Sequence, residues 1–476
     1  MSLFRKNAKK DKTEENNEYL DVMRQITILM ERLFDNLFPG ANYQRLITSL
    51  ELLGVLHRAF FVYQPQGMNK ASTVGDPGFL VQHVQDVHGL MHFNSHKHMA
   101  KMITSCVLHY MIDVKSSAAE ILTHFSMEHS GIALVFQNAV ELSCSFKFSD
   151  CESAAALFKL CLNWHGHSSP WMPFLTADWL AKIKHNKQLI TAVNQATNQK
   201  KDYSLHCLLL ALYHELFEQR QPFLALAKNA PMHGLLTSLR AILEESGLSN
   251  NENLSAFHTD LINELERSIQ FMMEILSGGN RNKNASFAQM GIAVESMISE
   301  EAMEEDLTDD KVAISDDHSL VLACAWLNLK ECCLVASKMY RDARPEIIER
   351  AGQLIISVLT GTRQKGALEA AASAMAEFCA CLLLGQHEKL PEKWLLDLIE
   401  QIQNVGQMAS VTRRSAGWPM LIRAIVSSEN RGTSGGRHLL NLAVNGCIGI
   451  LNSSDSFLEA TETEDVPHSH ALHVLK

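Results

Sequence analysis

Apolar residues near the start of the chain recur at alternating intervals of four and three residues. This spacing places them on one face of an α-helix, because a helical turn contains 3.6 residues. Pro39-Gly40 interrupts the pattern, and a second apolar stripe follows in the predicted helix at 41–61. Two helices joined by such a turn form an αα-hairpin, the unit from which helical solenoids are stacked. The two stripes are Tyr19, Met23, Ile26, Met30, Leu33 and Leu37, then Leu46, Leu50, Leu53 and Leu56.

The same alternation of helical patterns and short breaks continues along the rest of the chain. Segments 75–78 and 166–173 contain glycine or proline breakers and predict loops. Helical patterns cover about 79–111, 115–125, 132–145, 150–164, 176–219, 232–246 and 252–277, and further apolar stripes run through 322–336, 368–382, 394–402 and onward from Leu421.

The amino-acid composition also favours helices along the whole chain. The 476 residues contain only 11 prolines and 24 glycines, too few for the frequent turns of a β-sandwich. No fixed repeat sequence aligns between the helical pairs, which favours degenerate stacking over motif-rich repeats. We therefore predict an all-α fold, an α-solenoid of HEAT- or armadillo-like helical repeats.

Charge divides the chain into segments. Residues 1–16 form a basic tail that we expect to be disordered, and 17–279 form helical repeats. Residues 295–317 contain ten acidic side chains against the single Lys311, so we interpret 280–317 as an acidic linker or loop. A second block of repeats covers 318–476. Because the apolar residues Leu472 and Leu475 have no following helix to cover them, we expect the chain to be truncated at its C-terminus.

The remaining composition excludes several classes of protein. Eleven scattered cysteines, no secretory signal and no apolar run near the roughly 18 residues of a membrane span indicate a soluble protein of a reducing compartment. A net charge of -11 does not indicate a nucleic-acid binder by itself. No nucleophile elbow, phosphate loop or dinucleotide fingerprint is present. We therefore predict no catalytic centre, no cofactor, no small-molecule substrate and no membrane contact.

Histidines offer one alternative. His88, His92 and His96 recur every four residues, so a helix would place all three on one face, where they could bind zinc. A catalytic zinc site normally adds a carboxylate and a general base, and no His-Glu-x-x-His occurs here. An ordinary polar helix face is the favoured interpretation, and a metal-dependent enzyme remains the rival one.

Arginines give the second candidate site. Five of them, Arg413, Arg414, Arg423, Arg431 and Arg437, are opposed only by Glu429 between residues 412 and 438. The first two directly precede the small residues Ser415, Ala416 and Gly417. Arginine side chains at such a junction can hold a phosphate or a partner's carboxylate. They can equally form internal pairs that tie neighbouring loops, and the residues alone favour neither function.

Residues 412–419, Thr-Arg-Arg-Ser-Ala-Gly-Trp-Pro, resemble the signature of the thyroid adenoma-associated protein family and its fungal counterpart, and are called the signature segment below. The resemblance is good over 318–476 and fair around 30–60. Trp418 departs from the family, which more often has an aliphatic residue there. Supporting segments in family order are Trp326 with Leu329-Lys330-Glu331, then 363–369, Leu390-Pro391 with Trp394-Leu395, and 467–473, while 37–45 matches nearer the start.

The resemblance implies a long helical-repeat protein of the cytosol. It implies a non-catalytic regulatory subunit whose partners are a tRNA 2′-O-ribose methyltransferase and tRNA. That enzyme modifies the first nucleotide of the anticodon loop. By the same resemblance Arg413, Arg414, Ser415, Ala416 and Gly417 form the RNA- or partner-binding motif. The alternative is a protein-only HEAT-repeat scaffold that does not contact RNA.

Overall fold

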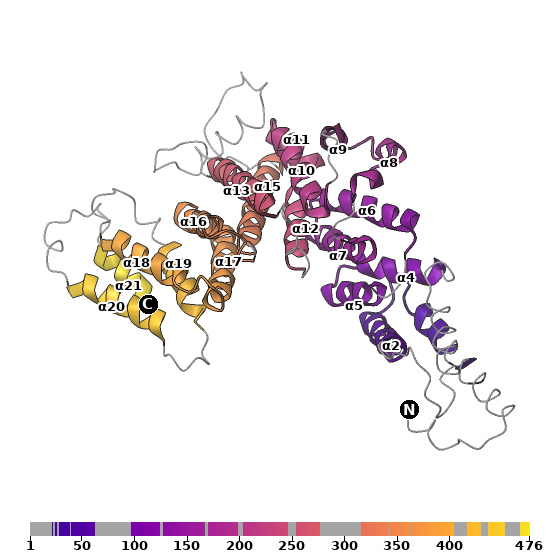
Figure 1. The fold of residues 1–476 in the computed structure, drawn as a ribbon, viewed down its shortest axis with the longest axis horizontal. Coiled ribbons are helices and arrows are strands. Elements are labelled where there is room, and N and C mark those ends of the chain that lie inside the picture. Colours follow the sequence, from indigo (N-terminus) through magenta and orange to yellow (C-terminus); the bar gives the residue numbers. More distant parts are fainter. Residues whose placement is uncertain are drawn as a thin grey trace, which may run out of the picture. The chain divides into compact units, whose positions relative to one another are not determined.

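All regular elements in the described part of the chain are helices (Figure 1). The computed structural model describes residues 21, 24–25, 28–38, 40–61, 97–123, 127–166, 170–198, 203–245, 254–276, 316–341, 343–362, 364–403, 417–429, 437–452 and 467–476. The prediction of an all-α fold is confirmed for these residues. They divide into two compact units, 1–139 with 156–166 and 140–155 with 167–476.

The first unit is built on helices α2 (Tyr43–Phe61), α4 (Lys97–Val107) and α5 (Ile112–Leu122), with the adjoining parts of α6 (His129–Ser143) and α7 (Phe148–His165). Helix α5 packs against both α2 and α4. The predicted stripe of α2 is confirmed for Leu46, Leu50 and Leu53, which are buried. Between α6 and α7 the rings of Phe136 and Phe158 meet edge to face, 5.7 Å apart.

The second unit contains the remaining helices. They are η1 (Met172–Phe174), α8 (Ala177–Lys182), α9 (Lys187–Asn198), α10 (Leu205–Glu218), α11 (Phe223–Asn229), α12 (His233–Leu243), α13 (Leu254–Leu276), α15 (Asp316–Ala336), α16 (Pro345–Gly361), α17 (Lys365–Leu383), α18 (Leu390–Gln403), α19 (Gly417–Ser427), α20 (His438–Asn452) and α21 (Pro467–Leu475).

Helices of the second unit form two layers. One layer follows the order α10, α13, α16, α18, α20, and the other follows α12, α15, α17, α19, α21. Each helix contacts its neighbour within the layer and a helix of the facing layer, for example α13 with α15 and α16 with α17. The buried core between the layers includes Leu265, Leu329, Phe378, Trp394 and Leu421. An amphipathic helix can bury its apolar face only in this way, against neighbours on the same stack.

Ion pairs join successive helices of the first layer. Arg267 of α13 pairs with Glu218 of α10, and Arg350 of α16 pairs with Glu266 of α13 at 2.7 Å. Lys393 of α18 pairs with Glu349 of α16, and His438 of α20 lies 3.3 Å from Glu392 of α18. At each of these four junctions the carboxylate belongs to the earlier helix and its arginine, lysine or histidine partner to the later one. At the first junction His214 with Glu264 has the opposite order.

Several helices differ from the sequence expectation. The pattern at 176–219 comprises three helices, α8, α9 and α10. Helix α8 ends at Lys182, and Asn186 caps the start of α9: its side chain accepts from the Leu189 backbone amide at 3.0 Å and donates to the Asn229 carbonyl at 2.9 Å. Helices α11 and α16 were not predicted individually. Both follow a proline signal, since Pro345 is the first residue of α16 and Pro222 immediately precedes α11.

Two helices are long and apolar enough to cross a membrane by length and composition, Asp317–Ala336 within α15 and Lys365–Leu383. Both lie inside the stack, since α15 contacts α12, α13 and α17, and α17 contacts α15, α16 and α19. Lys330 and Glu331 also interrupt the first of them. Core packing therefore accounts for their apolar composition, and the absence of a membrane partner stays a prediction.

The helices on either side of the acidic segment pack directly on each other, because α13 contacts α15. Residues 277–315 themselves, and the predicted basic tail at 1–16, lie outside the described residues. The assignment of 280–317 as a linker or loop therefore stays a prediction, except that its last residues, Asp316 and Asp317, begin α15.

Buried His233 makes the stability of this stack depend on pH. It begins α12, is 1% exposed and meets the Phe146 ring edge on at 5.9 Å. Burial, with a smaller contribution from the positive charge of Lys330, lowers its pKa from 6.5 to about 4. Below pH 6.5 the unfolded chain therefore binds a proton that the folded chain does not bind until about pH 4.

We expect the free energy of unfolding to fall by up to about 1.4 kcal/mol per pH unit on this account as pH drops below 6.5. Urea unfolding of the His233→Phe variant, which keeps a ring in the site, should show a shallower pH dependence than the wild type over that range. The same exchange at exposed His185 serves as control. Equal pH dependence of wild type and His233→Phe would contradict the assignment.

Candidate functional site

Only one residue of the predicted binding motif lies in the described part of the chain. Arg413, Arg414, Ser415 and Ala416 fall within 404–416, outside the described residues, whereas Gly417 is the buried first residue of α19. The site is therefore built from Gly417 and from the helices that surround the start of α19. These are α16, α17 and α21, each of which contacts α19.

Gly417 touches the backbone of α16 where that helix ends. A Cβ added at Gly417 would lie 1.7 Å from the carbonyl oxygen of Leu359 and 2.8 Å from its carbonyl carbon. A backbone carbonyl cannot move aside as a flexible side chain can, so every other residue type is excluded here on steric grounds. The same Cβ would lie 3.6 Å from Cδ2 of Leu368 near the start of α17. Glycine thus fixes the last residue of the predicted binding motif, within the signature segment, against α16 and beside the start of α17.

Trp418 continues this anchoring on the other side. Its ring is half-buried and meets the ring of His470 edge on, with centroids 4.9 Å apart. His470 belongs to 467–473, the last of the segments that resemble the family. The tryptophan that departs from the family pattern is therefore an interhelix contact between α19 and α21, worth about 0.5–1.5 kcal/mol for a well-placed aromatic pair.

Other segments that resemble the family also contain residues that pack between helices. A Cβ at Gly366, in segment 363–369, would lie 2.7 Å from Nε1 of Trp326 on α15. Trp394 of α18 lies so close to Gly352 of α16 that a Cβ there would be 2.2 Å from its ring, and it stacks on Phe378 of α17 at 6.0 Å. The segments recognised separately in the sequence therefore hold neighbouring helices of one stack together.

Glu331, in the segment with Trp326, is buried and pairs with two cations. Its carboxylate lies 3.3 Å from Nε of Arg240 on α12 and 3.4 Å from Nζ of Lys330. Removing one partner of a buried pair leaves an uncompensated charge, so this arrangement joins α12 to α15. Together with Arg267 and Arg350, Arg240 shows arginine in the internal pairing that the sequence analysis left open for Arg413 and Arg414.

The acidic residue nearest to the arginine-rich region is already engaged. The Glu429 carboxylate accepts hydrogen bonds from the backbone amides of Leu439 at 2.8 Å and Leu440 at 3.4 Å, at the start of α20. Arg423 and Arg437 are exposed, and so is Lys365 at the start of α17. Lys365 lies 3.7 Å from the carboxylate of Glu369, which is also exposed, so the described surface at the start of α17 carries both charges. Glu429 caps the start of α20.

The alternative metal site, at His88, His92 and His96, lies outside the described residues. Among the residues that are described, no group of three or more histidine, cysteine or acidic side chains is arranged to hold a metal ion. No disulfide joins the described cysteines, and most of them are buried. Burial raises the pKa of the Cys324 thiol to about 12 and of Cys106 to about 11, so both remain neutral thiols.

The sequence analysis singled out Gly417 but did not predict which residues it contacts. Leu359, the C-terminal turn of α16 and the His470 ring were not singled out, and no local signal pairs them with residues more than 50 positions away. A glycine directly before a Trp-Pro helix start does signal a close approach of backbones, since only glycine tolerates one.

These contacts define a stacked, all-helical protein whose distinctive segments join helix to helix. The family model described as THADA/TRM732, DUF2428 matches residues 256–476. The chain is also similar over its whole length to the tRNA (32-2′-O)-methyltransferase regulator THADA of Gallus gallus (23% identical) and of Homo sapiens (22%), and over 95% of its length to the regulator trm732 of Schizosaccharomyces pombe (22%). No solved structure matches the chain.

The resemblance to the THADA/TRM732 family predicted from the sequence is therefore confirmed. The chain covers 26% of the length of the chicken and human relatives and 28% of the fission-yeast relative. It thus spans about a quarter of the length of the curated relatives that it matches.

Gly417→Ala should destabilise the second unit by about 2–3 kcal/mol, because the added methyl group would force α19 away from the Leu359 carbonyl. Gly449→Ala is the matched control: Gly449 lies inside α20 with nothing within 4 Å of an added Cβ. That exchange should stabilise the protein by up to about 1 kcal/mol through helix propensity. Chemical unfolding of both variants measures the difference, and equal stabilities would refute the close contact.

Proposed function

We propose that this chain is part of a non-catalytic adaptor for tRNA 2′-O-ribose methylation, which positions tRNA and a separate methyltransferase for modification of the first nucleotide of the anticodon loop. The observation that supports this most is similarity along the whole chain to proteins named tRNA (32-2′-O)-methyltransferase regulators. The adaptor acts in the cytosol. It requires no cofactor, no small-molecule substrate and no membrane.

The architecture of the adaptor is an α-solenoid of HEAT- or armadillo-like repeats. Two layers of helices, joined by ion pairs and close backbone contacts, support this proposal because each helix pair contacts only its neighbours in the stack. Such a stack offers a long surface on which two macromolecules can bind in a fixed relation. Holding enzyme and substrate in that relation removes part of the entropic cost of bringing them together, which raises the methylation rate.

Within this adaptor the signature segment contacts the tRNA backbone or the docked enzyme, through Arg413, Arg414, Ser415, Ala416 and Gly417. The packing of Gly417 on Leu359 supports this role, since it fixes the end of the segment against α16 and beside the start of α17. Arg414 precedes Gly417 by three residues in the sequence. Helix starts attract phosphate, and the arginine side chain binds it through two parallel hydrogen bonds.

The direct test is ribose methylation of tRNA at the first anticodon-loop nucleotide, with the full protein and its cognate methyltransferase. Arg413→Ala/Arg414→Ala should reduce methylation by about tenfold or more, if each lost charge-assisted contact is worth about 1.5–3 kcal/mol. Circular dichroism and thermal melting should match the wild type, because these arginines precede α19 rather than form it.

The control is Lys184→Ala/Lys187→Ala, which removes the same charge from two exposed residues of the same unit and should leave methylation unchanged. If the arginine variant methylates as well as the wild type, the two arginines are structural. If the wild-type protein itself does not stimulate the enzyme, the adaptor proposal fails.

A protein-only scaffold is the second candidate. The observation that favours it is the use of arginine elsewhere in this unit: Arg240, Arg267 and Arg350 all pair with carboxylates of neighbouring helices. The two functions differ in the salt dependence of tRNA binding. Contacts to phosphates give an affinity that falls steeply with salt, by a slope of about one per phosphate contact. An adaptor without RNA contact should show no such binding while still binding the methyltransferase.

A further inference from the structure

The turn between α8 and α9 exposes four side chains that can carry a positive charge. The buried side chains of Ile183 and Leu189 fix this turn on the core, so its cations point outward. From 177 to 198 the sequence has one acidic residue, Asp178, against three lysines. We call the four exposed residues the basic turn, and they are Lys182, Lys184, His185 and Lys187.

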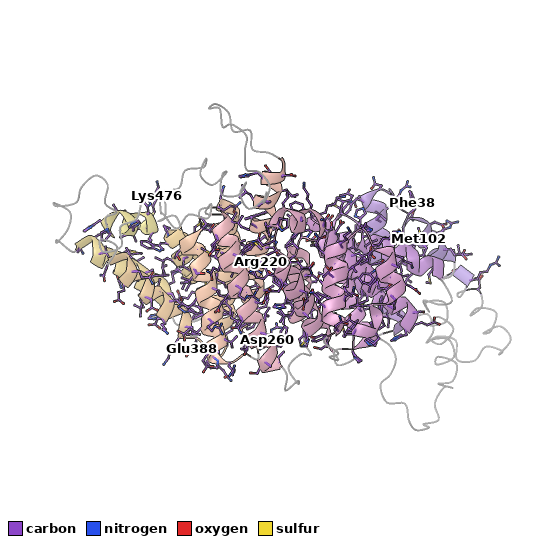
Figure 2. All side chains as sticks on the ribbon, turned by 90° about the horizontal axis from the view of Figure 1, so that it is seen from above. Phe38, Met102, Arg220, Asp260, Glu388 and Lys476 are labelled. Carbon is purple, nitrogen blue, oxygen red and sulfur yellow. The ribbon has the colours of Figure 1, made fainter. Side chains whose placement is uncertain are left out.

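The basic turn differs from other cations of this unit in its pairing. Arg220, which precedes α11 and is labelled in Figure 2, lies 3.9 Å from the carboxylate of Glu218, and Lys393 pairs with Glu349. Among the described residues, no carboxylate lies within ion-pair distance of the lysines of the basic turn. Cations that follow one another so closely in the chain repel each other, so the turn favours an anion with several charges.

The basic turn lies beside the point where the acidic segment 280–317 enters α15. Asn186, within the turn, donates from its side-chain amide to the carbonyl of Asn229, the last residue of α11, at 2.9 Å. The preceding residue, Lys228, pairs with Asp317 at 2.7 Å. Asp317 is the second residue of α15 and the last acidic residue of that segment. Helix α11 contacts both α9 and α15 (Figure 1), so two short contacts connect the end of the acidic segment to the basic turn.

The acidic segment has the charge and the length to pair with the basic turn. Residues 295–310 contain eight acidic side chains and no lysine or arginine, and we call them the acidic stretch. Glu305 precedes Asp317 by twelve residues, and twelve residues can extend over about 40 Å. Because the stretch belongs to the same chain, its effective concentration at the turn is on the order of millimolar, so weak individual ion pairs suffice to hold it there.

From these contacts we infer that the acidic stretch of this chain docks on the basic turn and covers it. Its carboxylates pair with Lys182, Lys184 and Lys187, next to the pair that Asp317 forms with Lys228. A polyanion such as RNA then reaches the basic turn only by displacing the stretch. The docked stretch thereby prevents an exposed group of lysines from binding nucleic acid without selectivity. This inference goes beyond the proposed function and does not rest on it.

Carbodiimide cross-linking of the full chain tests the contact, because this reagent joins an amine to a carboxylate that touches it. Mass spectrometry should find links from Lys182, Lys184 or Lys187 to the acidic stretch. Salt at about 1 M should largely remove them, since it shortens the screening length to about 3 Å. Lys389, exposed directly before α18, is the matched control and should form few such links. Equal linking of Lys389, or links that increase with protein concentration as contacts between two copies do, overturns the proposal.

Binding of a labelled single-stranded oligonucleotide of uridines measures whether the turn is covered. A glutamine variant of the full chain exchanges four carboxylates of the stretch for amides, by Glu300→Gln, Glu301→Gln, Glu304→Gln and Glu305→Gln. Its affinity for the oligonucleotide should exceed that of the wild type by about tenfold, if the stretch covers the turn for about nine-tenths of the time. Adding Lys184→Ala/Lys187→Ala to this variant should remove the gain, whereas adding Lys389→Ala should not.

Circular dichroism checks that all variants are folded. Equal affinity of the wild type and the glutamine variant overturns the proposal, because the turn would then be uncovered in both. A gain that persists after Lys184→Ala/Lys187→Ala also overturns it, since the general loss of negative charge would then explain the tighter binding. Stimulation of the methyltransferase is not part of either measurement, so failure of the adaptor proposal leaves this test intact.

Discussion

The structure of the second unit depends on the burial of each helix between its neighbours. No helix here has a core of its own, because an amphipathic helix has a single apolar stripe and the stack provides the surface that covers it. Glycine allows the closest of these contacts. Where α19 begins, the backbone of Gly417 lies against the last turn of α16, and the whole helix takes its position from that contact. Ion pairs along the first layer add orientation more than stability, since most are partly exposed.

This packing gives the family segments a physical meaning. Trp326, Gly366, Trp394, Gly417 and Trp418 are each in contact with a different helix from their own. A sequence signature of this kind preserves the relative placement of helices rather than a reactive group. A signature made of packing residues is consistent with the names of the relatives, which are called regulators of a methyltransferase. A substitution at a packing glycine such as Gly417 would therefore displace a whole helix rather than a single side chain.

The helices and their buried faces could be predicted from the sequence because both follow from local periodicity. Leu368, Met375 and Phe378 were assigned to one stripe and are all buried. Helix α16 was missed although Pro345 and the spacing of Ile347, Ala351 and Ile355 signal it. The contacts of the candidate site could not be predicted, since Gly417 with Leu359 and Trp418 with His470 join residues far apart in the chain. Arg413 and Arg414 were found by composition and resemblance alone.

The order of charges along the first layer has a consequence for assembly. Because the earlier helix supplies the acid and the later helix the base at four successive junctions, the layer has a direction, as an actin filament or a nucleic-acid strand has. Head-to-tail addition satisfies these charges, whereas head-to-head addition would oppose like with like. A chain built in this way can be lengthened or shortened by whole helix pairs during evolution without a new rule of contact.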